Sequence, residues 1–114
     1  MNKGKKKIGL AKPEIIRRAF EINALFQTGR FVRGRWFDLV YLTGGHRQAA
    51  FAVTKKVKTA VQRNRIKRLM REAYRLEKKC FRENVRVILI GHENILQAHL
   101  SELREDMHKM AAKI

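Results

Sequence analysis

The chain of 114 residues has a single cysteine, a single proline and few acidic side chains. Because Cys80 stands alone, an internal disulfide is excluded, which fits a reducing compartment. Apolar runs such as residues 87–90 are far shorter than the roughly 20 residues that a membrane-spanning helix needs. The lysines near the start are not followed by a long apolar stretch, so an ordinary secretory signal is not expected. These absences predict a cytoplasmic protein without a membrane partner.

Acidic residues are strongly outnumbered, with 10 Asp and Glu against 27 Lys and Arg and a formal net charge of +17. Like charge at this density works against a compact state. Hydrophobic residues nevertheless make up 45% of the chain, which favours a folded core over a disordered basic tail. A polyanion would relieve the repulsion, and on charge alone the candidates are nucleic acid or an anionic membrane surface. We expect one domain over residues 1–114, with residues 1–12 as a flexible basic arm.

The hydrophobic pattern predicts an α+β or α/β two-layer sandwich, in the order helix, strand, strand, helix, strand, helix. Pro13 suits the first turn of a helix whose apolar residues recur until Gly29. Gly44 and Gly45 resemble a hairpin turn between two strands. The other expected bounds are strands over residues 35–42, 48–54 and 85–90 and helices over residues 60–80 and 98–113. The apolar strand 85–90 should lie inside the sheet, parallel to a neighbour.

The expected helix 60–80 separates apolar from cationic side chains. Ile66, Leu69, Met70 and Ala73 share one side, which should pack on the sheet. The opposite side carries Asn64, Lys67, Arg68, Arg71 and Arg75, with Arg63 and Arg65 flanking the row. Like charges at this spacing repel, and the helix dipole disfavours cations at the amino end. A phosphate backbone reverses both penalties, whereas a merely solvated face would mix signs more evenly.

This basic stretch resembles the signature of the bacterial ribonuclease P protein, whose core is the Arg-Asn-Arg run at residues 63–65. The matching positions are Val57, Ala60, Arg63, Asn64, Arg65, Ile66, Lys67, Arg68, Met70 and Arg71. Similar residues to those of the family also stand at Phe26, Gly29, Phe37, Lys55 and Lys56. Lys58 and Thr59 replace the usual Gly-Asn before the helix, where Thr59 can still serve as the N-cap.

The resemblance implies a small sandwich with a left-handed β-α-β crossover, which general rules would not predict. It implies that the Arg-Asn-Arg helix faces a catalytic RNA and that the protein helps this RNA cut the 5′ leader from precursor tRNA. Magnesium and the active site would belong to the RNA subunit, so the protein alone would hold no catalytic residue and no cofactor. No obligate protein partner is expected.

A second RNA contact is implied in a cleft between the first helix and the sheet, which receives the single-stranded leader. Single strands bind grooves that combine cations with flat rings for stacking. Phe26 and Tyr41 are the candidate rings, and Lys55 and Lys56 are the candidate cations. Ile22 stands where the family often has Phe, which alters the expected cleft. For each ring the alternative is ordinary core packing.

The sequence offers no set of residues for protein-based cleavage. His46, His92, His99 and His108 do not pair with another His or with Cys at a ligand spacing, and a Gly-rich phosphate motif is missing. A free-standing nuclease is therefore disfavoured. A DNA-binding protein would need a helix-turn-helix pattern, which does not surround the basic helix. The alternative that stays open is a non-catalytic RNA-binding protein of ribosomal or chaperone type.

Binding to RNA should depend steeply on salt, because cations that neutralise Z phosphates release counterions with a log-log slope of roughly −0.7Z to −0.9Z. With about five cations of the basic helix engaged, the expected slope is about −4. A salt titration of RNA affinity measures it, and a slope near zero would mean that the charge serves solubility.

Overall fold

A computed structural model describes residues 14–114, so the arm expected over residues 1–12 and the helix start expected at Pro13 lie outside the described residues. The helices and strands are α1 (Ala19–Thr28), β1 (Arg30–Val32), β2 (Phe37–Thr43), β3 (Gln48–Val53), α2 (Ala60–Glu77), β4 (Val85–Gly91) and α3 (Leu100–Ala111). Short 3-10 turns, η3 (Lys78–Cys80) and η4 (Glu93–Gln97), follow α2 and β4. No described helix is both long and apolar enough to span a bilayer.

The four strands form one sheet in the order β1-β2-β4-β3. The strand β4 lies inside the sheet, antiparallel to β2 and parallel to β3, as its continuous apolar sequence predicts. The expected hairpin of β2 with β3 is wrong, because β4 lies between these two strands. Gly44 and Gly45 do turn the chain with positive φ angles of 129° and 69°, but they join strands that are not neighbours.

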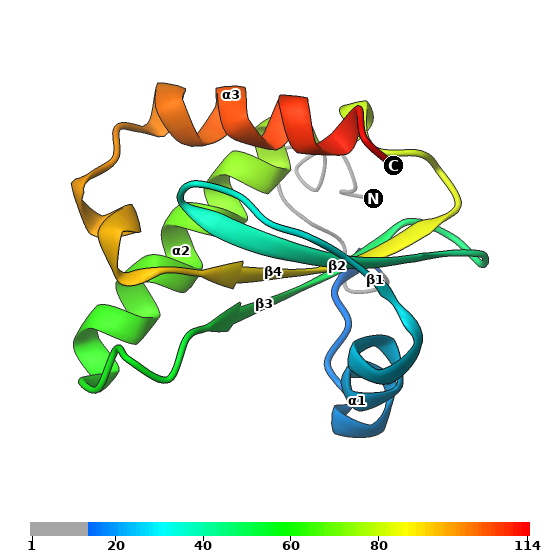
Figure 1. Ribbon diagram of the computed structural model, residues 1–114, viewed down its shortest axis with the longest axis horizontal. Coiled ribbons are helices and arrows are strands. Elements are labelled where there is room, and N and C mark those ends of the chain that lie inside the picture. The colour runs from blue at the N-terminus through cyan, green and yellow to red at the C-terminus, as the bar shows by residue number, and fades with distance from the viewer. Residues whose placement is uncertain (1–13) are drawn as a thin grey trace, which may run out of the picture.

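The helices α2 and α3 cover one face of the sheet, and α1 lies alone on the other (Figure 1). The larger core cluster fills the side of α2 and α3, with Phe37, Leu39, Ile66 and Met70 among its fully buried residues. A smaller cluster lies under α1, formed by Ile16, Leu25, Val40, Ala50 and Ile88. The α+β fold is confirmed, and the short α1 leaves part of the second face uncovered.

The first helix starts later than the apolar spacing suggested. It begins at Ala19, whereas Ile15 makes a parallel bridge with Ala49 and the Ile16 N–H donates to the Ala49 carbonyl at 2.8 Å. These β-branched residues therefore cover the exposed edge of β3 instead of forming a helical turn. Strand β1 was missed as well, because three residues are too few to show an alternating pattern.

Two contacts fix the position of α2 on the sheet, one at its N-terminus and one where its buried side meets β4. Thr59 is the N-cap, with its Oγ1 accepting from the Gln62 N–H at 3.3 Å, as expected. Gly91 at the end of β4 lies directly under Ile66 and Met70, with no space for a Cβ atom. The β3–α2–β4 segment is a parallel β-α-β unit. The left-handed sense of its crossover stays a prediction from the resemblance.

Candidate nucleic-acid interface

The solvent-facing side of α2 carries the cationic row that the sequence predicted. Asn64, Arg65, Arg68 and Arg71 are exposed, while Lys67 and Arg75 are half-buried. A shallow hollow of about 290 Å³ lies along the first two turns and is lined by Val61, Asn64, Arg65 and Arg68. These positions recur every three or four residues, so they form one stripe on the helix.

The cations of this stripe differ in whether the protein already neutralises them. Arg75 pairs with Glu72 at 2.5 Å, and this contact lowers the pKa of Glu72. Arg71 lies over the Phe51 ring, 5.6 Å from its centre. Within residues 14–114, Arg65, Lys67 and Arg68 have neither a hydrogen bond nor an ion pair. The uncompensated charge therefore gathers on the amino-terminal half of α2.

Arg63 was expected among the RNA-contacting cations, yet its guanidinium is engaged inside the protein. Its Nη1 donates to the carbonyls of Thr54 and Val57 at 3.0 and 2.9 Å, and its Nη2 donates to the Val53 carbonyl at 3.3 Å. These bonds tie the start of α2 to the end of β3 and to the connection between them. A contact of Arg63 with RNA stays a prediction, and it would have to come in addition to this structural role.

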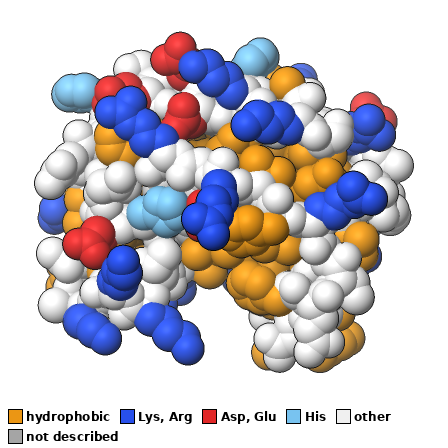
Figure 2. Space-filling model, viewed as in Figure 1, with side chains coloured by type: hydrophobic (Ala, Val, Ile, Leu, Met, Phe, Trp, Pro, Cys, Tyr) orange, Lys and Arg blue, Asp and Glu red, His pale blue; other side chains and the backbone are white. Residues whose placement is uncertain are grey.

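The second face of the sheet is hollowed beside α1. Figure 2 shows apolar side chains inside this hollow, between the lobe of α1 and the lobe that holds the amino-terminal end of α2. Ala52, Ile90 and Ile22 pack partly against the small core cluster and stay half-buried. The hollow therefore has an apolar floor that α1 does not close.

Phe26 is 46% exposed and belongs to neither core cluster, so its ring is available at the surface of α1. Lys55 and Lys56 are exposed on the connection that leaves β3. Four of the five predicted leader residues therefore lie outside the larger core cluster. Ile22 and Phe26 are on α1, and Lys55 and Lys56 follow the end of β3.

The structure places the Tyr41 side chain outside the predicted leader cleft. Side chains alternate along β2, and Tyr41 follows Phe37 and Leu39 to the side of α2 and α3, where it packs against the larger core cluster. Its neighbour Val40 faces α1 instead. Applying the period of two to the predicted strand would have shown that Tyr41 cannot share a face with α1.

A group of polar side chains, which the sequence did not predict, lies at the end of the sheet face that α1 partly covers. Asp38 is the register partner of Ile90, and its Oδ2 lies 3.0 Å from the His92 Nε2. A cavity of about 380 Å³ next to this pair is lined by Thr54, Lys56, His92, Glu93 and Asn94. This cavity therefore brings Lys56 beside the polar side chains of His92 and Asn94.

Among residues 14–114, one group of three metal-ligating side chains comes together: Glu77, Cys80 and His108. Sequence spacing could not find it, because Cys80 and His108 lie 28 residues apart and meet through packing of α2 against α3. The group holds a single carboxylate, whereas magnesium prefers several oxygen ligands in an octahedral site. The described residues therefore do not fit a protein-held magnesium site.

Comparison with known proteins gives a consistent result. A family model described as Ribonuclease P matches residues 10–114. The chain is similar to the ribonuclease P protein component of Syntrophus aciditrophicus, with 30% identity over 110 residues that cover 95% of this chain and 92% of that protein. The component of Desulfotalea psychrophila is 32% identical over 98 residues, which cover 84% of this chain and 82% of that protein. The solved ribonuclease P protein of Thermotoga maritima shares the fold, with a TM-score of 0.75, 20% identity and coverage of 89% and 97%.

Replacing Arg63 and Arg68 by alanine should separate the structural cation from the free one. Arg63→Ala removes three charge-assisted bonds to carbonyls and should lower the free energy of unfolding by about 2 kcal/mol. Arg68→Ala removes an exposed, unpaired charge and should change it by less than about 0.5 kcal/mol. Urea unfolding of both variants measures the difference, and equal stabilities would contradict the assigned role of Arg63.

Proposed function

The chain belongs to the ribonuclease P protein family. We propose that one face of it binds the catalytic RNA of that enzyme and that another face binds the precursor tRNA substrate. It is the protein subunit of ribonuclease P, an endoribonuclease of tRNA processing, and this membership implies a ribonuclease P RNA as partner. The observation that carries the proposal is the separation of unpaired cations on α2 from the apolar hollow beside α1.

The catalytic RNA binds the amino-terminal half of α2 in this proposal. Arg65, Lys67 and Arg68 are the cations without a protein partner in residues 14–114, so phosphates can neutralise them without breaking an ion pair. The free N–H groups of the first helical turn add to the same site. Arg71 and Arg75 extend the row, although the Glu72 carboxylate competes with phosphate for Arg75. Asn64 lies between these cations and can hydrogen-bond either phosphate or sugar.

The single-stranded 5′ leader of precursor tRNA lies in the hollow beside α1. The half-buried Ile22, Ala52 and Ile90 give unpaired bases an apolar floor, and the exposed ring of Phe26 offers a stacking surface. Lys55 and Lys56 supply cations where β3 ends. The neighbouring Asn94 amide donates one N–H to the Arg35 carbonyl and can donate its second N–H to RNA. An A-form duplex would not need such a floor, since its bases are already stacked.

In this proposal the RNA subunit holds the active site and its magnesium, and this chain contributes charge and shape. The protein assists endonucleolytic removal of the leader, which gives the mature 5′ end of the tRNA. A cytoplasmic location and the lack of an obligate protein partner are part of the same proposal. A ribosomal or chaperone role is not favoured, because family and relatives carry the ribonuclease P name.

Reconstitution with a bacterial ribonuclease P RNA at low magnesium tests this function. The full chain should restore cleavage of precursor tRNA, and the chain without RNA should not cleave. Phe26→Leu keeps apolar bulk but loses the flat ring, so the holoenzyme should bind precursor tRNA about 5- to 150-fold more weakly, as expected for 1–3 kcal/mol of stacking. Mature tRNA, which has no leader, should bind as before.

Phe20→Leu is the matched control, because Phe20 lies on the same helix and is 65% exposed but two positions from Ile22, on another side. It should leave precursor binding unchanged. Equal losses for precursor and mature tRNA, or equal effects of the two variants, would refute a leader contact at Phe26.

A further inference from the structure

A cluster of metal-ligating side chains lies where α2 ends against α3, and neither RNA face uses it. The Sγ atom of Cys80 lies 2.9 Å from the His108 Nδ1 and 3.6 Å from the Glu77 Oε1. The third side of this triangle, from His108 Nδ1 to Glu77 Oε1, measures 3.8 Å. Thiol, imidazole and carboxylate thus converge from α2, the η3 turn and α3. From this geometry we propose that the chain binds one zinc ion through Cys80, His108 and Glu77.

The spacing of the three ligand atoms suits tetrahedral zinc. With bonds of about 2.0–2.3 Å, neighbouring ligand atoms in such a site lie roughly 3.3–3.6 Å apart. The separations of 2.9, 3.6 and 3.8 Å bracket this range. Lengthening the Cys80–His108 separation by roughly 0.6 Å and shortening the His108–Glu77 separation by roughly 0.5 Å completes the triangle. The η3 turn and the exposed His108 can supply that movement without disturbing the core.

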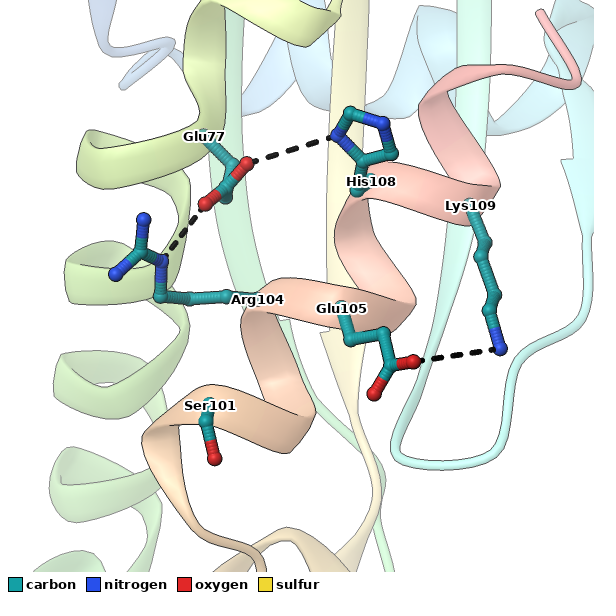
Figure 3. A pocket seen from close by; sticks show the side chains of 6 residues that line it. All are labelled: Glu77, Ser101, Arg104, Glu105, His108 and Lys109. Carbon is teal, nitrogen blue, oxygen red and sulfur yellow. Dashed lines mark hydrogen bonds and ion pairs between the residues drawn. The ribbon is translucent and has the colours of Figure 1, made fainter.

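The carboxylate is held ready by a neighbouring arginine. The Arg104 Nε donates to Glu77 Oε2 at 2.7 Å, so Oε1 is the oxygen that faces Cys80 and His108. Figure 3 shows Glu77 between Arg104 and His108, with one oxygen toward each. Such outer partners orient ligands and raise metal affinity.

The site is accessible from solvent and leaves one coordination position open. The side chain of His108 is 66% exposed, while that of Glu77 is 15% exposed. A cavity of about 550 Å³ beside them is lined by Glu77, Ser101, Arg104, Glu105, His108 and Lys109. Water can therefore fill the fourth position of a tetrahedral ion, which enters without unfolding the helices.

The donor set selects zinc over the magnesium of the catalytic RNA. A thiolate and an imidazole are ligands of zinc and similar borderline ions, whereas magnesium takes oxygen ligands. On binding, the Cys80 S–H bond breaks, its proton goes to solvent, and the S–Zn bond forms. The thiolate and the Glu77 carboxylate then balance the two positive charges of the ion. The bound metal would tie the carboxyl end of the RNA-binding helix to α3.

Titration of the metal-free full chain with Co²⁺ alone tests the site, because cobalt reports its ligands by absorption. One equivalent should give a thiolate-to-cobalt band in the near ultraviolet with the visible bands of tetrahedral geometry. Adding Zn²⁺ should abolish both. Zn²⁺ should also raise the melting temperature of the wild-type chain, because it binds the folded state.

Cys80→Ser should abolish the charge-transfer band and the zinc-dependent rise in melting temperature. His108→Gln should weaken cobalt binding at least tenfold, and Arg104→Gln about tenfold, as is typical of an outer partner. His46→Ala, an exposed histidine outside the cluster, should bind cobalt as the wild type does. Circular dichroism of the metal-free variants shows that they are folded, and if Cys80→Ser is not, His108→Gln decides.

A wild-type chain that binds no cobalt, or binds it without a thiolate band, overturns the site. Equal cobalt binding by wild type and Cys80→Ser would do the same. The outcome is independent of the RNA-binding proposal, since neither RNA is present in the titration.

Discussion

The packing of α2 on the sheet is the constraint on which the functional surfaces depend. Ile66 and Met70 press onto Gly91, where β4 has no side chain, and this contact fixes the rotation of the helix. Once the apolar side is buried, Asn64, Arg65 and Arg68 must face solvent. The repulsion between these cations is the cost of this arrangement, and in the proposed function RNA phosphates relieve it. Arg63 supports the same geometry by holding the preceding connection.

In the proposed function the two faces of the sheet bind different RNAs, because they are covered unequally. The larger core under α2 and α3 supplies the rigidity, whereas α1 shields a smaller cluster and leaves Ala52 and Ile90 half-buried. A partly open apolar floor would be a liability in water, but it suits unpaired bases. The proposed zinc ligands lie at a third place, the carboxyl end of α2, where it packs against α3. Two of them, Glu77 and His108, are drawn in Figure 3.

The sequence predicted features that depend on local pattern and missed those that depend on pairing. The basic row, the Thr59 cap and the inner position of β4 followed from periodicity, capping chemistry and apolar content. Strand order is set by long-range pairing, so Gly44 and Gly45 suggested a hairpin that does not form. The place of Tyr41 was predictable from alternation but was assigned from its chemistry alone. The internal bonds of Arg63 and the meeting of Cys80 with His108 arise only when distant segments pack together.

The central claim, that separate faces bind the two RNAs, is tested most directly by mapping each face onto its RNA. Because Cys80 is the single cysteine, a Cys80→Ser background allows one probe site at a time. An iron chelate attached through Val61→Cys on exposed α2, or Asn23→Cys on exposed α1, generates hydroxyl radicals that cut RNA nearby. In the assembled complex with precursor tRNA, the α2 probe should cut the catalytic RNA and the α1 probe should cut the leader. Leader cleavage from the α2 probe, or cleavage of the same catalytic-RNA segment from both probes, would contradict the division of faces.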